Sequence, residues 1–218
     1  MLKLKSLKKS YQQGLENIEI FEHLDFHVDI GQRVAIMGKS GSGKSTLLSL
    51  ISGIIKPDSG DIVLNSVSYK DLQESELNDF RATNIGFIFQ NFHLVSYLNA
   101  LENVMLPAKV CGISKPKEKA IELLESVGLS HRLDHLPSQL SGGEKQRVAI
   151  ARALIHNPKI ILADEPSGNL DDETGNAVMD ILFELIKKNN TTLILVTHSK
   201  DVAARCEKTY ELIHGKLT

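Results

Sequence analysis

The chain has 218 residues, of which 42% are hydrophobic and 24% are charged, and its formal net charge is −2 at pH 7. This length allows a substantial buried core, and the composition argues against a disordered chain and against nucleic-acid binding through bulk positive charge. The two cysteines, Cys111 and Cys206, lie far apart and form no C-x-x-C pair, which is typical of incidental thiols in a reducing compartment.

No stretch reaches the roughly 20 apolar residues that a membrane-spanning helix needs. The N-terminus alternates like a strand and lacks the apolar block of a signal peptide. We therefore expect a soluble, cytoplasmic protein that reaches a membrane only through a partner.

The first part of the chain predicts short strands, then one buried strand and a helix. Apolar and polar side chains alternate near the N-terminus, which is typical of an antiparallel lobe. The alternating apolar positions are Leu2, Leu4, Ile20, Leu24 and Phe26. Residues 33–37 are an apolar run that predicts a buried strand, and a helix is expected from Lys44 to about Gly53, before turn-forming residues 56–60.

The remainder predicts a helical insertion between strands. Residues 85–89 predict a buried strand with Gln90 at its end. Helical spacing follows from about 91 to 139, interrupted at Pro107, Gly112, Pro116 and Gly128. Further strands are expected at 159–163, 192–196 and 209–213, with a helix from about 173 to 188 and a turn at 214–215. This alternation predicts an α/β fold with a mainly parallel sheet.

The strongest local motif is the run from Gly38 to Ser45, which fits the G-x-x-x-x-G-K-[ST] phosphate loop. Its glycines allow close backbone approach, so that successive N–H groups and a helix N-terminus can hold nucleotide phosphates. Lys44 is expected to reach the β- and γ-phosphates, Ser45 to bind Mg²⁺, and Thr46 to contact the inner phosphates. The alternative is a Gly/Ser loop that only caps a helix, and the motif alone does not separate kinases, GTPases and transport ATPases.

A second motif follows the apolar run 160–163, where Asp164 and Glu165 are adjacent. A carboxylate at the end of a buried strand can hold Mg²⁺ directly or through water, which is the role expected for Asp164. The alternative is a carboxylate pair that caps the next turn.

The third motif, Leu140-Ser141-Gly142-Gly143-Glu144, opens a predicted helix whose positive end suits a γ-phosphate. It also fits an ordinary N-cap followed by an amphipathic helix. Together the three motifs resemble the ATP-binding cassette family, and the resemblance runs from end to end of the chain. Glu144 stands where the family usually has glutamine, although glutamate is also common there, so this departure from the family pattern is mild.

The resemblance implies the fold of that family: a P-loop NTPase core with a mainly parallel sheet, an N-terminal antiparallel β lobe and a helical subdomain. On this reading residues 1–218 are a single ATPase domain, with the core and β lobe in 1–90 and 141–218 and the helical subdomain in 91–140. Members of the family close two cassettes head to tail, so a homodimer is implied. One chain's phosphate loop and its partner's signature motif would then hold the same ATP.

The resemblance also implies roles for single residues. Glu165 corresponds to the general base, Gln90 to the glutamine that senses Mg²⁺ and the attacking water, and His198 to the histidine that contacts the γ-phosphate. With Lys44, these are the expected catalytic residues. Asp171, in the loop 167–171 expected to meet the partner's phosphate loop, and Tyr11, expected to stack on adenine, join the ATP-binding set. A lone Gln, His or Tyr is more often structural, and a strand-end tyrosine is often core.

The ATP and Mg²⁺ sites follow from these assignments. The residues expected to bind ATP are Tyr11, Gly38, Ser40, Gly41, Ser42, Gly43, Lys44, Ser45, Thr46, Ser141, Gly142, Gly143 and Asp171. The residues expected to bind Mg²⁺ are Ser45, Gln90 and Asp164. Ser199 follows His198 where the family commonly has aspartate.

Only 49 residues separate Gln90 from Leu140, too few for the coiled-coil arms of chromosome-maintenance relatives, and a single cassette argues against translation-factor relatives. Residues 85–94, 99–107 and 163–171 are similar to the bacterial lipoprotein-release (LolD-like) and macrolide-exporter (MacB-like) ATPases. This resemblance implies a subunit peripheral to the cytoplasmic face of the inner membrane. It would energise a permease with a large periplasmic domain for export or for lipoprotein or lipid extraction, without contacting nucleic acid.

Two alternatives stay open from the sequence. The ATPase could instead regulate a periplasmic enzyme without transport, like the cell-division relative. The apolar surface around Phe92, Leu94, Tyr97 and Leu98 is a candidate groove for a permease coupling helix, but these side chains could equally pack the helical subdomain. The substrate cannot be read from this chain because substrate contacts belong to the permease.

Overall fold

The computed structural model describes residues 1–14 and 16–218. Its backbone forms two compact units. The first unit contains residues 1–81 and 192–218, and the second contains residues 82–191.

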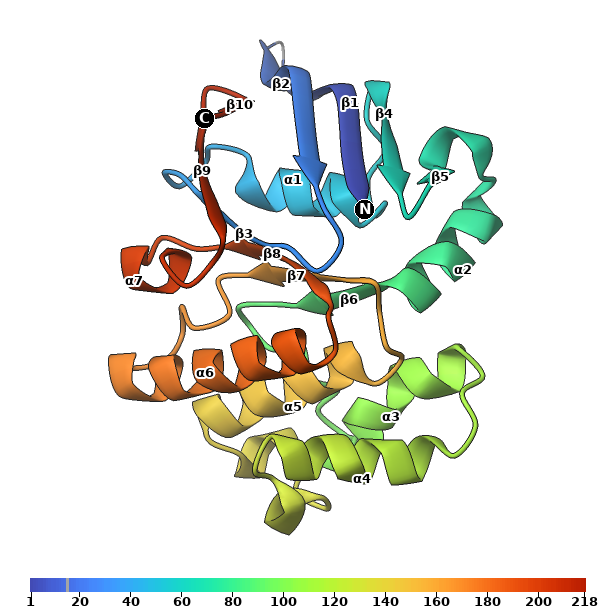
Figure 1. The fold of residues 1–218 in the computed structure, drawn as a ribbon, viewed down its shortest axis with the longest axis vertical. Coiled ribbons are helices and arrows are strands. Elements are labelled where there is room, and N and C mark those ends of the chain that lie inside the picture. The colour runs from blue at the N-terminus through green and yellow to red at the C-terminus, as the bar shows by residue number, and fades with distance from the viewer. Residues whose placement is uncertain (15) are drawn as a thin grey trace. The chain divides into compact units, whose positions relative to one another are not determined.

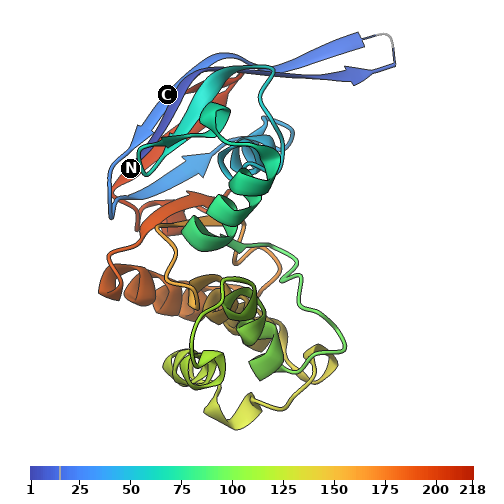
Figure 2. The same ribbon diagram turned by 90° about the vertical axis from the view of Figure 1, so that its right-hand side faces the viewer.

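An antiparallel sheet makes up the N-terminal part of the first unit, in the order β2-β1-β4-β5. Its strands are β1 (Leu2–Gln13), β2 (Glu16–Val28), β4 (Ser59–Leu64) and β5 (Val67–Ser68). Figure 1 shows β1 between β2 and β4, and Figure 2 shows the long hairpin that β1 and β2 form. Leu2, Leu4, Leu24 and Phe26 are buried, so the predicted alternating pattern does mark one core-facing side of this lobe.

Parallel strands form the other layer of the first unit. Strand β3 (Arg33–Met37) pairs in parallel with β8 (Thr192–Val196) and with β9 (Lys208–Ile213), and β10 (Lys216–Leu217) pairs antiparallel with β9. The middle of β3 and all of β8 are buried. Continuous apolar runs of this kind are typical of parallel strands covered on both faces, and the prediction of these strands is confirmed.

Helix α1 (Lys44–Ile51) follows β3 and buries Leu47, Leu48 and Leu50. It is shorter than predicted because Gly53 takes a left-handed conformation (φ 68°) and its N–H bonds to the carbonyl of Leu50. Among the elements described so far, those missed from the sequence are β4, β5, η1 (Tyr69–Asp71), α2 (Glu74–Asn84), α7 (Lys200–Ala203) and β10. Only Leu77 of α2 is buried, so this polar helix carries no strong apolar periodicity.

The second unit packs helices against the parallel pair β6 (Ile85–Ile88) and β7 (Ile160–Asp164). Its helices are α3 (Ala100–Val110), α4 (Pro116–Ser126), η2 (Ser130–Arg132), η3 (Pro137–Gln139), α5 (Gly142–Leu154) and α6 (Asp172–Lys188). Helix α5 is central, since it contacts α3, α4, α6 and β6. Among the described residues, no helix is both long and apolar enough to cross a membrane.

The predicted helical subdomain, residues 91–140, lies inside this second unit, together with β6, β7, α5 and α6. Its boundaries therefore stay a prediction. Of the expected interruptions, Pro107 does not end a helix: α3 runs through it because Val104 and Ala108, on either side, are buried in the core. Gly112, just after α3, and Gly128, just after α4, take left-handed conformations, as expected of residues that follow a helix end.

Gly86 fixes how closely β6 approaches α5. A Cβ atom at this position would collide with the carbonyl of Ala153 and the side chain of Ile161. Because one contact is backbone, the neighbours cannot move aside cheaply. We expect Gly86→Ala to lower the free energy of unfolding by about 1–3 kcal/mol, measured by urea denaturation.

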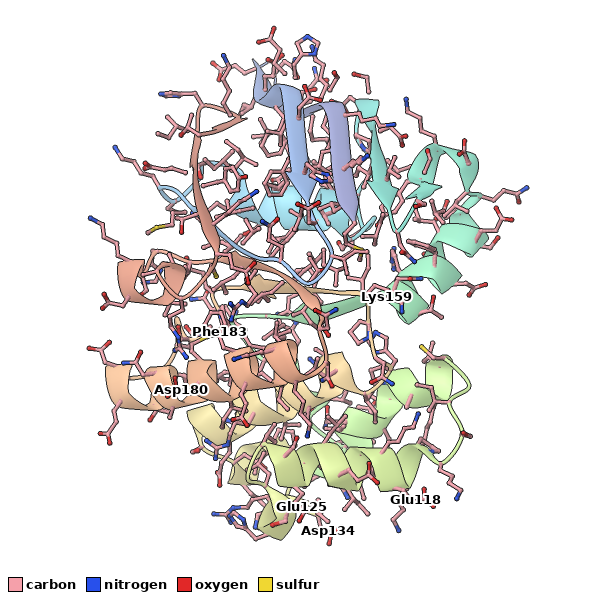
Figure 3. The ribbon with its side chains drawn as sticks, viewed as in Figure 1. Glu118, Glu125, Asp134, Lys159, Asp180 and Phe183 are labelled. Carbon is pink, nitrogen blue, oxygen red and sulfur yellow. The ribbon has the colours of Figure 1, made fainter. Side chains whose placement is uncertain are left out.

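The matched control is Glu125→Ala, on the outer side of α4 (Figure 3), where the side chain is exposed. It should change the free energy of unfolding by no more than about 0.5 kcal/mol. Equal effects of the two substitutions would show that the close β6–α5 packing does not require glycine.

Candidate functional site

In the first unit, the predicted phosphate loop joins β3 to α1. Gly43 is the N-cap of α1 and has a left-handed conformation (φ 100°). A Cβ atom there would collide with the side chain of Ile20, so both the backbone angle and the space require glycine. A Cβ at Gly38 would lie 2.8 Å from the carbonyl oxygen of Leu212. The loop is thus folded tightly against β2 and β9.

Three observations make this loop suitable for an anion. None of the described side chains caps the N-terminus of α1, and its first turn has no acidic residue, so its N–H groups and positive dipole end face the loop. The Lys44 ammonium donates hydrogen bonds to the carbonyls of Gly38 (2.8 Å) and Lys39 (2.9 Å), which holds its positive charge at the loop. The buried Ser42 hydroxyl has no hydrogen-bond partner among the described residues. This donor set matches phosphate oxygens.

The loop tip also borders open space. Residues 39–42 line a cavity of about 600 Å³ together with residues 18–20 of β2 and residues 211–215 at the end of β9. The cavity volume lies in the range of small-molecule sites.

Tyr11 is exposed rather than buried in the core, since 42% of its surface is accessible. It pairs with Ile18 across the β1–β2 hairpin, and the ammonium of Lys9 lies 5.4 Å from its ring centroid. Lys9 is itself held by Asp58, which it meets at 2.9 Å. The Lys9 ammonium therefore lies over one face of a ring that is still partly exposed to solvent.

His198 lies at the same edge of the parallel strands as the phosphate loop. Strands β3 and β8 run in parallel, and the N–H of Thr197 donates to the carbonyl of Ile36 (3.2 Å). His198, the next residue, is exposed. Ser199 then caps α7 by accepting a hydrogen bond from the N–H of Val202 (3.3 Å). Aspartate and serine are both good N-caps, which explains why Ser199 can replace the family's usual residue.

In the second unit, the parallel strands β6 and β7 bring Gln90 and the carboxylate pair to one edge. Ile88 is in register with Ala163, so the residues that follow each strand emerge together. Glu165 has a left-handed conformation (φ 47°), which is uncommon for a residue with a side chain. Its carbonyl accepts a hydrogen bond from the N–H of Gly168 (2.9 Å), which folds the loop 167–171 back toward this edge.

The predicted signature motif opens α5 with a capping box. The Ser141 hydroxyl accepts from the N–H of Glu144 (3.2 Å), and the Glu144 carboxylate accepts from the N–H of Ser141 (2.7 Å). Arg132 donates to the same carboxylate at 2.9 Å. These hydrogen bonds, that from the Ser141 N–H above all, hold the pKa of Glu144 below its ordinary value of 4.5.

The two glycines of the signature motif let α5 pack closely against its neighbours. A Cβ on Gly143 would collide with Thr174 of α6, and one on Gly142 would lie 3.0 Å from Leu170. Asp171 is the N-cap of α6, where its carboxylate accepts from the N–H of Thr174 (2.9 Å). That hydrogen bond is the main reason why the pKa of Asp171 is lowered. The start of α5 and the start of α6 are therefore built side by side.

Comparisons with known proteins agree with these features. Residues 21–168 match the sequence profile of the family described as ABC transporter. The chain belongs to the ABC transporter family. It is 47% identical over its full length to the lipoprotein-releasing system ATP-binding protein LolD of Legionella pneumophila (strain Paris), and it covers 96% of that relative.

Two further comparisons extend this result. The chain is 46% identical to the uncharacterized ABC transporter ATP-binding protein YbbA of Escherichia coli (strain K12), with 97% of this chain and 93% of the relative covered. A solved dimeric structure of the cassette MJ0796, in a post-hydrolysis state bound to ADP and Pi, matches with a TM-score of 0.91 and 41% identity. The match covers 100% of this chain and 96% of the other. The predicted α/β cassette fold is confirmed, and the chain is an ABC-type ATPase.

Each unit of this ABC ATPase thus assembles part of the predicted site. The first unit gathers the phosphate loop, Lys44 and His198, and places Tyr11 on the exposed hairpin. The second unit gathers Gln90, Asp164 and Glu165 at one strand edge and builds the signature motif next to Asp171. The roles of these residues in binding and hydrolysis stay predictions.

Sequence reasoning missed three polar side chains that shape the second unit. The fully buried Asn103 bonds the backbone of Val95, Leu98 and Asn99. Arg152 donates to backbone carbonyls just after Gln90, and Asn169 bonds Gln90 itself. An asparagine beside the carboxylate motif could have been noticed, but its partner lies 79 residues away in the chain.

The Glu144 interactions predict a pH-dependent stability difference for Glu144→Gln. Glutamine keeps the capping box but loses the charge that pairs with Arg132, so the variant should be less stable at pH 7 by about 0.5–1 kcal/mol. Because the folded-state pKa of Glu144 is lowered, the native advantage exists above its ordinary pKa of 4.5 and is lost as the pH falls through the folded value. Urea denaturation at pH 7 and at about pH 3 measures the difference, and a pH-independent difference would contradict this explanation.

Proposed function

We propose that this ABC ATPase is the energising subunit of a bacterial transporter of the lipoprotein-release type. The observation that carries the proposal is full-length identity of 47% with a LolD protein in a chain whose phosphate loop, carboxylate pair and signature helix occupy the positions described above. These relatives support a transporter subunit over the regulatory, cell-division type of ATPase.

ATP binding is proposed to rest on the first unit. Backbone N–H groups from Gly38 to Gly43, with Ser40 and Ser42 among them, would surround the phosphates, and Lys44 would turn from the loop carbonyls to the β- and γ-phosphates. Thr46 would contact the inner phosphates, and Tyr11 would stack on adenine through its exposed face. The orphaned Ser42 hydroxyl supports this role, because a phosphate oxygen would give it a partner.

The donor set also fits Mg²⁺. Ser45 offers a hydroxyl, Asp164 a carboxylate and Gln90 an amide oxygen, which are the hard oxygen ligands that this ion prefers alongside phosphates. When bound, Mg²⁺ supplies neutralisation of the negative charge that develops on the phosphoryl oxygens.

Hydrolysis is proposed to use Glu165 as general base. Its carboxylate would accept a proton from the attacking water, the water oxygen would bond to the γ-phosphorus, and the bond to the β–γ bridging oxygen would break to release ADP. Gln90 would orient the water, and His198 would donate a hydrogen bond to the γ-phosphate. Glu165 follows β7 at the edge where Gln90 follows β6, and its left-handed backbone conformation is uncommon for a residue with a side chain.

Two copies are proposed to complete each ATP site. The N–H groups at Ser141, Gly142 and Gly143 form the positive end of α5, which would meet the γ-phosphate held by the partner copy. Asp171, at the start of α6, would lie against the partner's phosphate loop. The dimeric state of the similar MJ0796 cassette supports this arrangement.

The remaining partner is proposed to be an integral-membrane permease with a large periplasmic domain, which would hold the ATPase at the cytoplasmic face of the inner membrane. The name of the LolD relative supports lipoprotein or another lipid-linked molecule as the class of substrate. Tyr97 is 80% exposed, so this side chain does not pack the helical region and is available to a partner, whereas Phe92, Leu94 and Leu98 are half-buried. The permease contact is proposed to include Tyr97.

The proposed general base predicts the behaviour of Glu165→Gln. The variant should bind ATP with unchanged affinity and lose about 10²–10⁴-fold in turnover, because glutamine cannot accept the proton. It should also accumulate as an ATP-bound dimer, measured by light scattering after size-exclusion chromatography. Lys44→Ala is the comparison, since it should weaken ATP binding itself; near-normal turnover by Glu165→Gln would rule out the assigned role.

The transporter assignment predicts what this chain binds in the cell. Tagged Glu165→Gln protein, recovered from native membranes with ATP and Mg²⁺, should bring down a permease with a large periplasmic domain, identified by mass spectrometry. The Tyr97→Ala form of the same protein should recover less of it while keeping ATP binding. Recovery of a soluble protein and no permease would overturn the membrane assignment and leave the ATPase intact.

A further inference from the structure

The side chain of Asn169 contacts both the backbone and the side chain of Gln90. Its Nδ2 donates to the Gln90 carbonyl at 3.0 Å and to Oδ1 of Asn91 at 2.8 Å. Its Oδ1 accepts from Nε2 of Gln90 at 3.3 Å. The side-chain amide of Asn169 therefore restrains both the backbone and the side chain of Gln90.

These contacts determine which way the Gln90 amide points. A backbone carbonyl only accepts hydrogen bonds, so the Asn169 atom facing it must be the donor Nδ2. The other Asn169 atom is then Oδ1, an acceptor, and the Gln90 atom facing it must be the donor Nε2. Gln90 Oε1 is consequently the atom that is left to face a cation or a water molecule, which is the orientation that a Mg²⁺ ligand needs.

The surroundings leave this contact little room to change. A Cβ on Gly168 would lie 2.9 Å from Nε2 of Gln90 and 3.3 Å from Cβ of Glu165, so the loop backbone sits directly against both side chains. Just after Gln90 in the chain, the carbonyls of Phe92 (2.7 Å) and His93 (2.6 Å) accept hydrogen bonds from Arg152 of α5. Both residues have left-handed backbones, with φ of 59° and 47°. The segment after Gln90 is thereby fixed to α5, and Asn169 fixes Gln90 itself.

We propose that Asn169 is a positioning residue that sets the amide orientation of Gln90 and so presents its Oε1 for Mg²⁺ and the attacking water. This inference rests on the proposed function of Gln90. The loop that carries Asn169 ends at Asp171, which is proposed to lie at the interface with a second copy. A shift of this loop on dimer closure would therefore move Gln90 with it.

The test is a double-mutant cycle of Asn169→Ala and Gln90→Ala, with steady-state ATPase activity measured at varied ATP and Mg²⁺. Asn169→Ala should lower kcat about tenfold, the equivalent of one or two modest hydrogen bonds. It should leave KM for ATP within about twofold and raise the Mg²⁺ concentration for half-maximal activity, because the phosphate loop is untouched but the Gln90 oxygen is no longer directed. In the Gln90→Ala background the same substitution should change kcat by less than about twofold.

Two variants guard against trivial explanations. Asn78→Ala, an exposed asparagine on α2, should leave both activity and thermal midpoint unchanged. Gly168→Ala pushes a methyl group toward the Gln90 amide and, at 3.3 Å, toward Cβ of Glu165, so it should lower kcat, and the part of that loss that disappears in the Gln90→Ala background reports the contact with Gln90. It therefore tests the same contact if Asn169→Ala fails to fold.

The outcomes separate this inference from the proposed function. If Gln90→Ala lowers kcat but Asn169→Ala lowers it by an equal factor in both backgrounds, the positioning role is overturned and the role of Gln90 stands. If Asn169→Ala leaves kcat and the Mg²⁺ dependence unchanged, the positioning role is likewise overturned. If Gln90→Ala itself retains normal activity, the proposed role of Gln90 fails, and the inference about Asn169 fails with it.

Discussion

The site depends on one constraint: buried parallel strands exclude polar chemistry from their length and concentrate it at their ends. In the first unit, β3 and β8 have buried interiors, so the phosphate loop and His198 occur where those strands stop. In the second unit, β6 and β7 impose the same limit on Gln90 and the carboxylate pair. Covering both faces of a parallel strand leaves its carboxyl end as the first position where charged groups remain solvated or can meet a ligand. The positions of the predicted site residues in the first unit and in the second unit therefore follow from core packing.

Helix N-termini are the second feature on which the predicted site depends, and the N-termini of α1 and α5 are capped differently. Helix α1 has neither a side-chain cap nor an acidic first turn, so its N–H groups are kept for phosphate. Helix α5 is capped by Ser141 and Glu144, which places a carboxylate close to a helix end assigned to a γ-phosphate. Arg132 pairs with that carboxylate and offsets its charge. The pair with Arg132 therefore reduces the negative charge that Glu144 places at the positive end of the helix.

The sequence was sufficient wherever structure follows from local pattern. Strands β3 and β8 were located residue for residue because a short apolar run between turn signals allows little else. The three motifs and the family resemblance supplied the candidate site residues, whose roles stay predictions. Helix α2 was missed because only Leu77 is buried, and α3 continues past Pro107 because core contacts outweigh local propensity. The contacts of Arg152 and Asn169 could not be predicted, since each joins residues far apart in the chain through side-chain geometry that no spacing rule describes.

The contacts that the sequence did not predict also determine how a candidate site residue is oriented. A motif specifies which atoms are present, but a glutamine can present either its oxygen or its nitrogen, and only the surrounding donors and acceptors decide between them. The Gln90 carbonyl fixes the orientation of the Asn169 amide, and the Asn169 amide in turn fixes the orientation of the Gln90 side-chain amide. Asn169 belongs to the loop that leads into Asp171 and α6, and this loop is proposed to contact a second copy of the chain. The orientation of Gln90, a proposed Mg²⁺ ligand, therefore depends on the position of that loop. An ATPase built in this way would have its metal ligand correctly directed only while that loop is in place, which ties hydrolysis to assembly through hydrogen bonds within one chain.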